Sequence, residues 1–280
     1  MNLQKHWKGD RWMSESEMKQ FMKKAIEDGI KGDINSIGGL TGDDAYKLHQ
    51  AIKDKKTKFD NTYLKAAAWS MAVNEINTEM GIVSACPTGG ACGLVAGTVL
   101  AVADSLESSD DEVIDALITA GGIGQRYTKV YSLSASVGGC QVEVGVAAGL
   151  ATAATAQLMG GSPSEIGEAT AICLKSIIGL TCGALGGLCE SPCVKRNGTG
   201  SSLAITSANM GLAGIKSQVP LDEVIWAIKN TGKHLPKKLL GTKPTGLAAT
   251  PTGIKKYEEV YGKEKAEQFI EEFKQYEMNK

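Results

Sequence analysis

The sequences GGCQVEVG at residues 138–145 and GLTCGALGGLCESPCVKRNG at residues 179–198 enclose an Ala-rich segment, and this stretch decides the fold. Cys140 lies in the first sequence, and Cys182, Cys189 and Cys193 lie in the second. The Ala-rich segment between them predicts closely packed helices. Cysteines in Gly-rich turns at both ends of a helical block indicate an inorganic centre bound by thiolates. We expect the rest of the chain to enclose that centre.

Helical patterns continue on both sides of this stretch. Ser14 and Ser162 are each followed three residues later by Glu, which is the pattern of a capping box at a helix start. No period-two pattern with hairpin turns indicates a strand. The sequence predicts an all-α fold, with Gly-rich turns between helices at residues 14–28, 43–55, 61–80, 94–103, 110–129, 142–159, 162–178, 202–213, 221–231 and 254–280. The predicted organisation is a lead-in (1–13), one helical domain (14–253) and a charged C-terminal helix (254–280).

Composition excludes several classes of partner. The 280 residues include 30 basic and 31 acidic side chains and only 5% aromatics, which argues against a nucleic-acid surface. The segment at residues 144–156 is too short to span a bilayer. The N-terminus lacks the apolar segment of a signal peptide, and the seven cysteines are an odd number. We therefore expect a cytoplasmic protein with reduced thiols.

The cysteine spacing restricts the kinds of metal centre that the chain could hold, but it is compatible with more than one interpretation. Between Cys140 and Cys182 lie 41 residues, and between Cys182 and Cys193 lie 10. This spacing lacks the CxxC pairs of zinc modules. Three thiolates can hold a [4Fe-4S] cluster and leave its fourth iron open as a Lewis acid, but buried apolar cysteines would give the same pattern.

A second Gly-rich turn has two interpretations. The sequence CPTGGACG at residues 86–93 precedes an apolar helix, whose N-terminus could bind a substrate carboxylate. The turn would equally serve as a tight connection between two helices.

Several motifs occur together in order, and through them the chain resembles the alpha subunit of iron-sulfur-dependent L-serine dehydratases from about residue 27 to residue 253. The motifs are SIGGLTGDD (36–44), NEIN (74–77), CPTGGACG (86–93), GCQVEVG (139–145), GLTC (179–182), PCVKRN (192–197) and GLAATPTG (246–253). The resemblance implies an all-helical catalytic domain with a [4Fe-4S] cluster. It also implies that Cys140, Cys182 and Cys193 are the cluster ligands.

The resemblance further implies a lyase that needs no pyridoxal phosphate. The open iron takes the substrate hydroxyl, a base removes the Cα proton, and water is eliminated from L-serine. The aminoacrylate formed then hydrolyses to pyruvate and ammonia. By resemblance, the loops that contact substrate contain Thr41, Pro87, Thr88 and Ser134.

Lys195, Arg196 and Asn197 directly follow Cys193. A cation beside a cluster could pair with a substrate carboxylate or offset the charge of the thiolates. A surface charge pair is the alternative interpretation of Lys195 and Arg196.

None of these motifs identifies the general base. His6, His49 and His234 lie outside the motifs, and each is expected on a solvated face or turn. The family's Ser-Ser-His-Thr motif, which belongs to a separate beta subunit or an N-terminal domain, does not occur in the sequence. We therefore expect a beta subunit as the partner in a heterodimer. It would supply that motif and is the candidate source of the base.

Two departures from the family bear on the substrate. The family's Cys-Asp-Pro at the second ligand is Cys182-Gly183-Ala184 here, and its Asn-Ala-Ser-Ile-Ser-Gly is VYSLSA at residues 130–135. A pocket is sensitive to the loss of such polar groups. The same elimination could thus act on another β-substituted amino acid, such as cysteine with release of sulfide. A non-catalytic regulatory paralogue is a further alternative.

Overall fold

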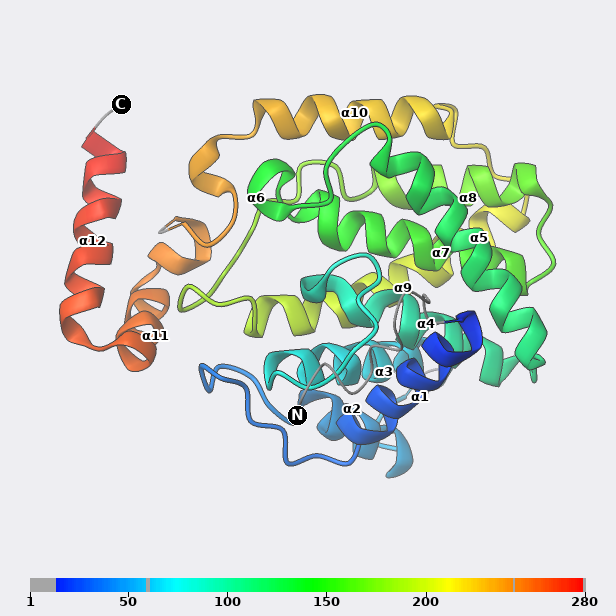
Figure 1. The fold of residues 1–280 in the computed structure, drawn as a ribbon, viewed down its shortest axis with the longest axis horizontal. Coiled ribbons are helices and arrows are strands. Elements are labelled where there is room, and N and C mark those ends of the chain that lie inside the picture. Colours follow the sequence, from blue (N-terminus) through cyan, green and yellow to red (C-terminus); the bar gives the residue numbers. More distant parts are fainter. Residues whose placement is uncertain (1–13, 59–60, 244, 279–280) are drawn as a thin grey trace.

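The computed structural model describes residues 14–58, 61–243 and 245–278, and within them the fold is helical with no β-sheet. The lead-in at residues 1–13, with His6, lies outside the described residues. Figure 1 shows the α-helices α1 (Glu15–Gly29), α2 (Asp44–Lys53), α3 (Asn61–Thr78), α4 (Cys92–Ser105), α5 (Asp110–Thr128), α6 (Ala135–Gly138), α7 (Val146–Leu158), α8 (Pro163–Lys175), α9 (Ser191–Leu212), α10 (Leu221–His234), α11 (Pro251–Tyr261) and α12 (Lys263–Met278). The prediction of an all-α fold is confirmed.

Serine capping boxes fix three helix starts. Ser14, Ser109 and Ser162 each accept a hydrogen bond from the backbone of a Glu three residues later, and that Glu reaches back to the cap backbone. Each pair satisfies two N–H groups that a helix start otherwise leaves free. The predicted starts at Ser14 and Ser162 are confirmed.

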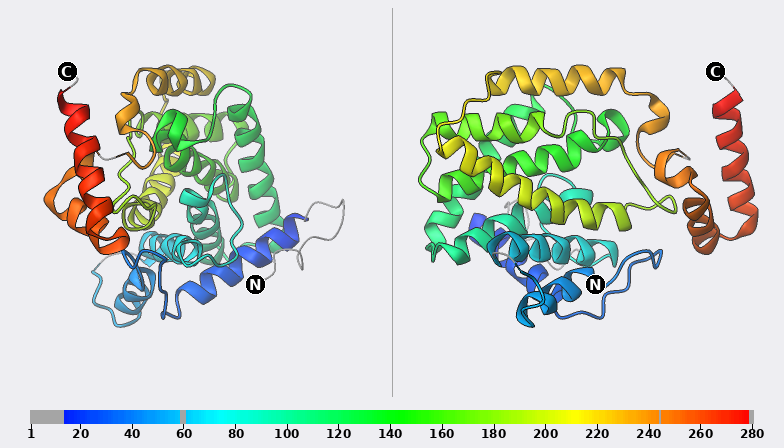
Figure 2. Two further views of the ribbon diagram at one scale, coloured as in Figure 1. Left: turned by 60° about the vertical axis from the view of Figure 1, so that its left-hand side comes forward. Right: turned by 180° about the vertical axis from the view of Figure 1, so that it is seen from behind.

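The core is built around α4 and α7. Every residue of α4 from Cys92 to Ala103 is buried, as is every residue of α7 from Val146 to Ala156. Helices α3, α5, α8 and α9 pack around this pair (Figures 1 and 2). Small side chains allow the close approach: a Cβ on Gly97 would lie 2.2 Å from the Ser70 backbone nitrogen of α3.

The start of α9 differs from the prediction. We expected a helix from residue 202, but α9 begins at Ser191 with Pro192 in its first turn. The sequence RNGTG looks like a break, yet its glycines serve helix packing. A Cβ on Gly198 would lie 3.0 Å from Met71 Cγ, and one on Gly200 would lie 2.7 Å from Leu94 Cδ2. Tertiary packing therefore overrides the low helix propensity of glycine.

Other predicted helix and loop boundaries also differ in the structure. The loop expected at residues 132–139 contains the short helix α6, and the helix expected from residue 142 starts with a π-helical turn, Gln141–Gly145. The turn expected at residues 243–253 contains a 3-10 helix, Gly246–Ala249, and the first turn of α11, which Thr250 caps.

The single C-terminal helix predicted from residue 254 is wrong. It is a pair, α11 and α12, because Gly262 has φ 84° and breaks the helix. Tyr257 stacks on Phe269 across the pair, with ring centroids 4.2 Å apart. Figure 1 shows the pair beside the main bundle. Among the described helices, none has the length and apolarity needed to cross a bilayer.

Candidate active site

Two of the predicted ligand thiols lie in direct contact. The Sγ atoms of Cys140 and Cys182 are 3.9 Å apart. Cys140 lies between α6 and the π-helical turn. Figure 1 shows α6 at the end of the bundle that faces the α11–α12 pair. Gly139 makes this junction possible, since its φ is 78° and a Cβ would lie 3.0 Å from the Leu180 carbonyl oxygen.

The buried side chain of Gln141 joins the two thiol-bearing segments. Its Oε1 accepts a hydrogen bond from the Gly179 N–H at 2.9 Å, and its Nε2 donates to the Gly138 carbonyl at 3.0 Å. The Gln141 backbone N–H donates to the Leu180 carbonyl at 2.9 Å. These bonds hold the segment before Cys182 against the segment that carries Cys140.

The Cys182 thiol lies where hydrogen bonds favour its ionised form. The Gly241 N–H lies 3.1 Å from its sulfur, and the Cys182 N–H donates to the Leu239 carbonyl at 3.1 Å. The hydrogen bond from Cys140 and that from Gly241 outweigh burial and lower the pKa of Cys182 to about 7. The same contact with Cys182, reinforced by burial, raises the pKa of Cys140.

The third predicted ligand stands in the first turn of α9, beside a fourth thiol. Cys193 is buried and donates a hydrogen bond to the exposed Cys189, which raises the pKa of Cys193 and lowers that of Cys189. The charge of Cys140 raises the pKa of Cys193, and the charge of Cys182 raises that of Cys189. The four thiols are therefore near enough to influence one another electrostatically, where the sequence predicted three ligands.

The donor set suits an iron-sulfur cluster. Cysteine thiolates are the usual ligands of such clusters, and backbone N–H bonds to sulfur, like that from Gly241, tune them. Among the described side chains, no three His, Cys, Asp or Glu residues meet at the spacing that a single metal ion requires. The thiols are thus grouped more loosely than in a mononuclear site.

Arg196 is the cation of this thiol group. Its Nη1 donates to the Thr181 carbonyl at 3.0 Å, and its charge lowers the pKa of Cys140, Cys182 and Cys193. A Cβ at Gly183 would lie 3.1 Å from Arg196 Nη2. The glycine that departs from the family pattern therefore leaves room for the guanidinium group.

Glu143 is a site residue that the sequence analysis missed. It lies on the π-helical turn, a feature frequent at functional sites, and burial raises the pKa of its carboxyl group. Its charge acts on Cys140, Cys182 and Cys189. One signal was available: Glu143 is the only charged residue between Cys140 and Gly161.

The turn at residues 86–93 faces Glu143. Thr88 and the Ala135 N–H lie against the carboxylate and oppose the rise in its pKa, and a Cβ at Gly90 would lie 3.3 Å from Glu143 Oε2. A substrate carboxylate at this turn would meet that negative charge. The geometry therefore favours the interpretation of this turn as a tight connection between two helices. Pro87 and Thr88 belong to the turn and lie at the site.

The buried amide of Asn197 holds this turn against α9. Its Oδ1 accepts from the Gly93 N–H at 3.0 Å, and its Nδ2 donates to the carbonyls of Gly90 at 3.0 Å and Cys193 at 2.8 Å. The polar atoms of Asn197 are occupied by backbone groups, so we assign it a positioning role.

Glu190 holds the loop that contains Thr41 beside the thiol group. Its buried carboxylate accepts from Ser36 Oγ at 2.7 Å, from the Gly38 N–H at 2.7 Å and from the Leu40 N–H at 3.1 Å. Because Glu190 directly precedes α9, the loop is fixed to the helix that carries Cys193.

Lys195 points into the same loop. It forms an ion pair with Asp44, which also accepts from Thr41 Oγ1 at 2.9 Å. A hollow of about 390 Å³ opens here, lined among others by Ser36, Thr41, Asp44 and Lys195. Thr41 and Lys195 are thus brought together, whereas Arg196 faces the thiols.

The remaining candidates lie at the rim or elsewhere. Ser134 caps α6, and its hydroxyl is 2.7 Å from that of Ser136. Tyr131 donates to the Val137 carbonyl at 3.2 Å. His49 is half-buried on α2, and the exposed His234 ends α10, so neither joins the site.

Cys86, Cys92 and Cys173 stay outside the thiol group. Burial raises the pKa of Cys86 and Cys173 to about 11 and that of Cys92 to about 12. Cys173 is fully buried in the core, as expected.

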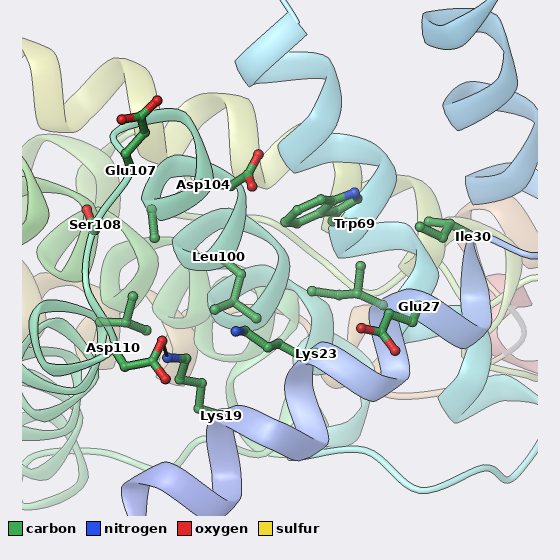
Figure 3. A pocket seen from close by; sticks show the side chains of 13 residues that line it. Lys19, Lys23, Glu27, Ile30, Trp69, Leu100, Asp104, Glu107, Ser108 and Asp110 are labelled. Atoms are coloured by element: carbon green, nitrogen blue, oxygen red, sulfur yellow. Dashed lines mark ion pairs between the residues drawn. The ribbon is translucent and has the colours of Figure 1, made fainter.

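A cavity of about 530 Å³ lies between α1, α3, α4 and α5, and Figure 3 shows Lys19 and Asp110 paired at its edge. None of the predicted site residues lines it.

Comparison with known proteins gives a consistent result. The family model described as "Serine dehydratase alpha chain" matches residues 4–248. A "Probable L-serine dehydratase, alpha chain" of Bacillus subtilis is 43% identical, over 86% of this chain and 80% of the relative. One of the same name from Latilactobacillus sakei is 40% identical, over 72% of this chain and 96% of the relative. An "L-serine dehydratase" of Haemophilus influenzae is 35% identical over 80% of this chain, and the match spans 52% of that longer relative.

Proposed function

The chain belongs to the serine dehydratase alpha chain family, and we propose from this that it is the cluster-binding subunit of a lyase that deaminates L-serine. In the proposed reaction the Cα proton and the β-hydroxyl leave as water. The aminoacrylate formed takes up water and gives pyruvate and ammonia. The observation that supports the proposal is the contact between the Cys140 and Cys182 thiols, whose sulfur atoms are 3.9 Å apart, together with the electrostatic effect of Cys140 on the pKa of Cys193 in a third segment.

The proposed cofactor is a [4Fe-4S] cluster held by these three thiolates. When bound, it supplies an open iron that acts as a Lewis acid toward the substrate hydroxyl. Within the chain, Gln141 and Asn197 fix the ligand segments, and Arg196 offsets the negative charge of the thiolates. Thr88 lies at the same site, because it contacts Glu143.

We propose that a beta subunit completes the site. Relatives of similar length are named alpha chains, whereas the Haemophilus relative is about twice as long as the matched part. Of the described histidines, His49 lies on α2, and His234 Nδ1 is 2.8 Å from the Asn230 carbonyl oxygen. The partner would therefore bring the Ser-Ser-His-Thr motif and the base that removes the Cα proton.

The test begins with iron and acid-labile sulfide per chain after anaerobic purification, for the wild type and for Cys182→Ala. We expect about four of each in the wild type, lost in the variant. Cys92→Ala is the matched control, because Cys92 is also a buried cysteine but packs in a different apolar cluster from Cys140. No iron after anaerobic reconstitution would refute the cofactor.

The activity test adds the candidate beta subunit and measures pyruvate and ammonia from L-serine. In parallel, sulfide release from L-cysteine tests the other leaving group. Full turnover of L-serine by the isolated chain would refute the need for the partner.

A further inference from the structure

Two opposite charges lie at the thiol group, and neither has a charged partner. Arg196 Nη1 donates to the carbonyl of Thr181, next to Cys182, and Glu143 lies on the π-helical turn that follows Cys140. Their charges shift the pKa of both thiols in opposite directions. Among the described residues, no ion pair includes Glu143 or Arg196, although the neighbouring Lys195 is paired with Asp44. The two charges also do not neutralise each other.

Such an arrangement costs stability unless a ligand uses it. Glu143 is half-buried on a turn whose neighbours Val142 and Val144 are core residues. Burial of a carboxylate without a cation is unfavourable, and the hydrogen-bond donors beside this carboxylate are Thr88 and the Ala135 N–H. A cation brought by a ligand would compensate the cost.

The surroundings of Arg196 fit an anion. One nitrogen is used by the Thr181 carbonyl, and the other nitrogens of the guanidinium group have no carboxylate within the described chain. Because Gly183 has no side chain, the guanidinium group packs against it, and a Cβ there would lie 3.1 Å from Nη2. A carboxylate accepts two parallel hydrogen bonds from this group, which fixes orientation as well as charge.

We propose that Glu143 binds the α-ammonium group of the amino-acid substrate while Arg196 binds its α-carboxylate. The inference deepens the proposed function and rests on it. A free α-amino acid carries both charges on one carbon, whereas a hydroxy acid or a simple amine carries only one. The pair therefore selects zwitterions, and the third substituent of the same carbon, CH2OH, is left for the cluster side of the site.

The experiment separates the two charges with two analogues of L-serine. Ethanolamine keeps the ammonium group and the hydroxyl but lacks the carboxylate; 3-hydroxypropionate keeps the carboxylate and the hydroxyl but lacks the ammonium group. Their affinities for anaerobically prepared holoenzyme are measured by isothermal titration calorimetry, and the KM for L-serine is measured beside them.

Glu143→Gln should weaken ethanolamine binding about ten- to hundredfold, which is the range of one lost charged hydrogen bond, and leave 3-hydroxypropionate unchanged. Arg196→Gln should do the reverse, and both variants should raise the KM for L-serine. Glu143→Asp, which keeps the charge, should retain part of the ethanolamine affinity. Glu27→Gln and Arg126→Gln are matched controls on exposed helix faces and should change nothing.

The outcomes distinguish a failure of this inference from a failure of the proposed function. If Glu143→Gln binds ethanolamine as tightly as the wild type, with iron content unchanged, the inference is refuted and the proposed function stands. An equal loss of both analogues in Glu143→Gln would also refute it, because that pattern indicates a disturbed site. If the wild-type holoenzyme neither binds the analogues nor turns over L-serine, the proposed function fails and the inference with it.

Discussion

The Glu190→Gln variant tests how the loop at residues 36–44 is held at the site. The Glu190 side chain is 4% exposed and accepts three hydrogen bonds, from Ser36, Gly38 and Leu40. A glutamine has one acceptor oxygen. In its better orientation this oxygen keeps the two bonds now made to Oε2, and its NH2 group faces the Gly38 N–H.

The expected loss follows from that count. One hydrogen bond to a charged acceptor disappears, and two N–H groups are left opposed, which together cost about 2 to 3 kcal/mol of unfolding free energy. For a chain of this size the midpoint of thermal unfolding should fall by roughly 3–5 °C. If the loop detaches before the bundle unfolds, part of the loss will appear as faster hydrogen exchange at Gly38 and Leu40.

The assay combines thermal unfolding with amide hydrogen exchange of the loop. Glu112→Gln is the control, because Glu112 also accepts from a serine and a backbone N–H but lies in an exposed capping box. Its change should stay near 1 kcal/mol or below. An unchanged midpoint together with unchanged protection at Gly38 and Leu40 in Glu190→Gln would refute the role assigned to this carboxylate.

Three further predictions concern packing, thiol chemistry and pH. Gly97→Ala should cost about 3 kcal/mol or more in urea unfolding, because its Cβ would lie 2.2 Å from the Ser70 nitrogen, whereas Gly121→Ala, with nothing within 4 Å, should gain up to about 1 kcal/mol. Alkylation of Cys182 in the cluster-free chain, followed by mass spectrometry, should reach half its maximal rate near pH 7, and Cys140→Ala should move that point to higher pH by removing the donor. Burial raises the pKa of Glu143, so the folded chain binds the proton of this carboxyl group more tightly than the unfolded chain does. The unfolding free energy should therefore fall as pH rises above the pKa of Glu143 in the unfolded chain. Glu143→Gln should flatten that fall, and a variant that loses stability faster with pH than the wild type would contradict the prediction.

Local signals explain why some of the fold is predictable. The starts at Ser14 and Ser162 follow from a serine and a glutamate three residues apart, and both groups act within one turn of helix. The start of α9 does not follow from such signals. The glycines at 198 and 200 resemble a break in the sequence, and only the positions of Met71 and Leu94 on other helices show why they lie inside a helix.

The same distinction applies to the site. The cysteines are visible in the sequence because their residue type restricts the chemistry, and resemblance then selects three of the seven. The contact between Cys140 and Cys182 depends on Gln141 and on the backbone of residues 179–182, which no spacing rule describes. Glu143 is a single charge in an apolar segment, and its direction depends on a π-helical turn that side-chain periodicity does not predict.

The departure at Gly183 connects these observations. In the family pattern the residue after the second ligand is an aspartate, and at position 183 even its Cβ would lie 3.1 Å from Arg196 Nη2, so the guanidinium group would have to shift from its present place. In this chain the glycine leaves Arg196 without that partner. A cation that is neither paired nor remote from the thiols is available to a ligand, and so is the Glu143 carboxylate. The loss of a polar group from the pattern therefore does not by itself indicate a lost activity. Under the proposed binding mode, the substrate carboxylate neutralises Arg196 in place of a protein side chain, which is a condition under which a charged site discriminates between ligands.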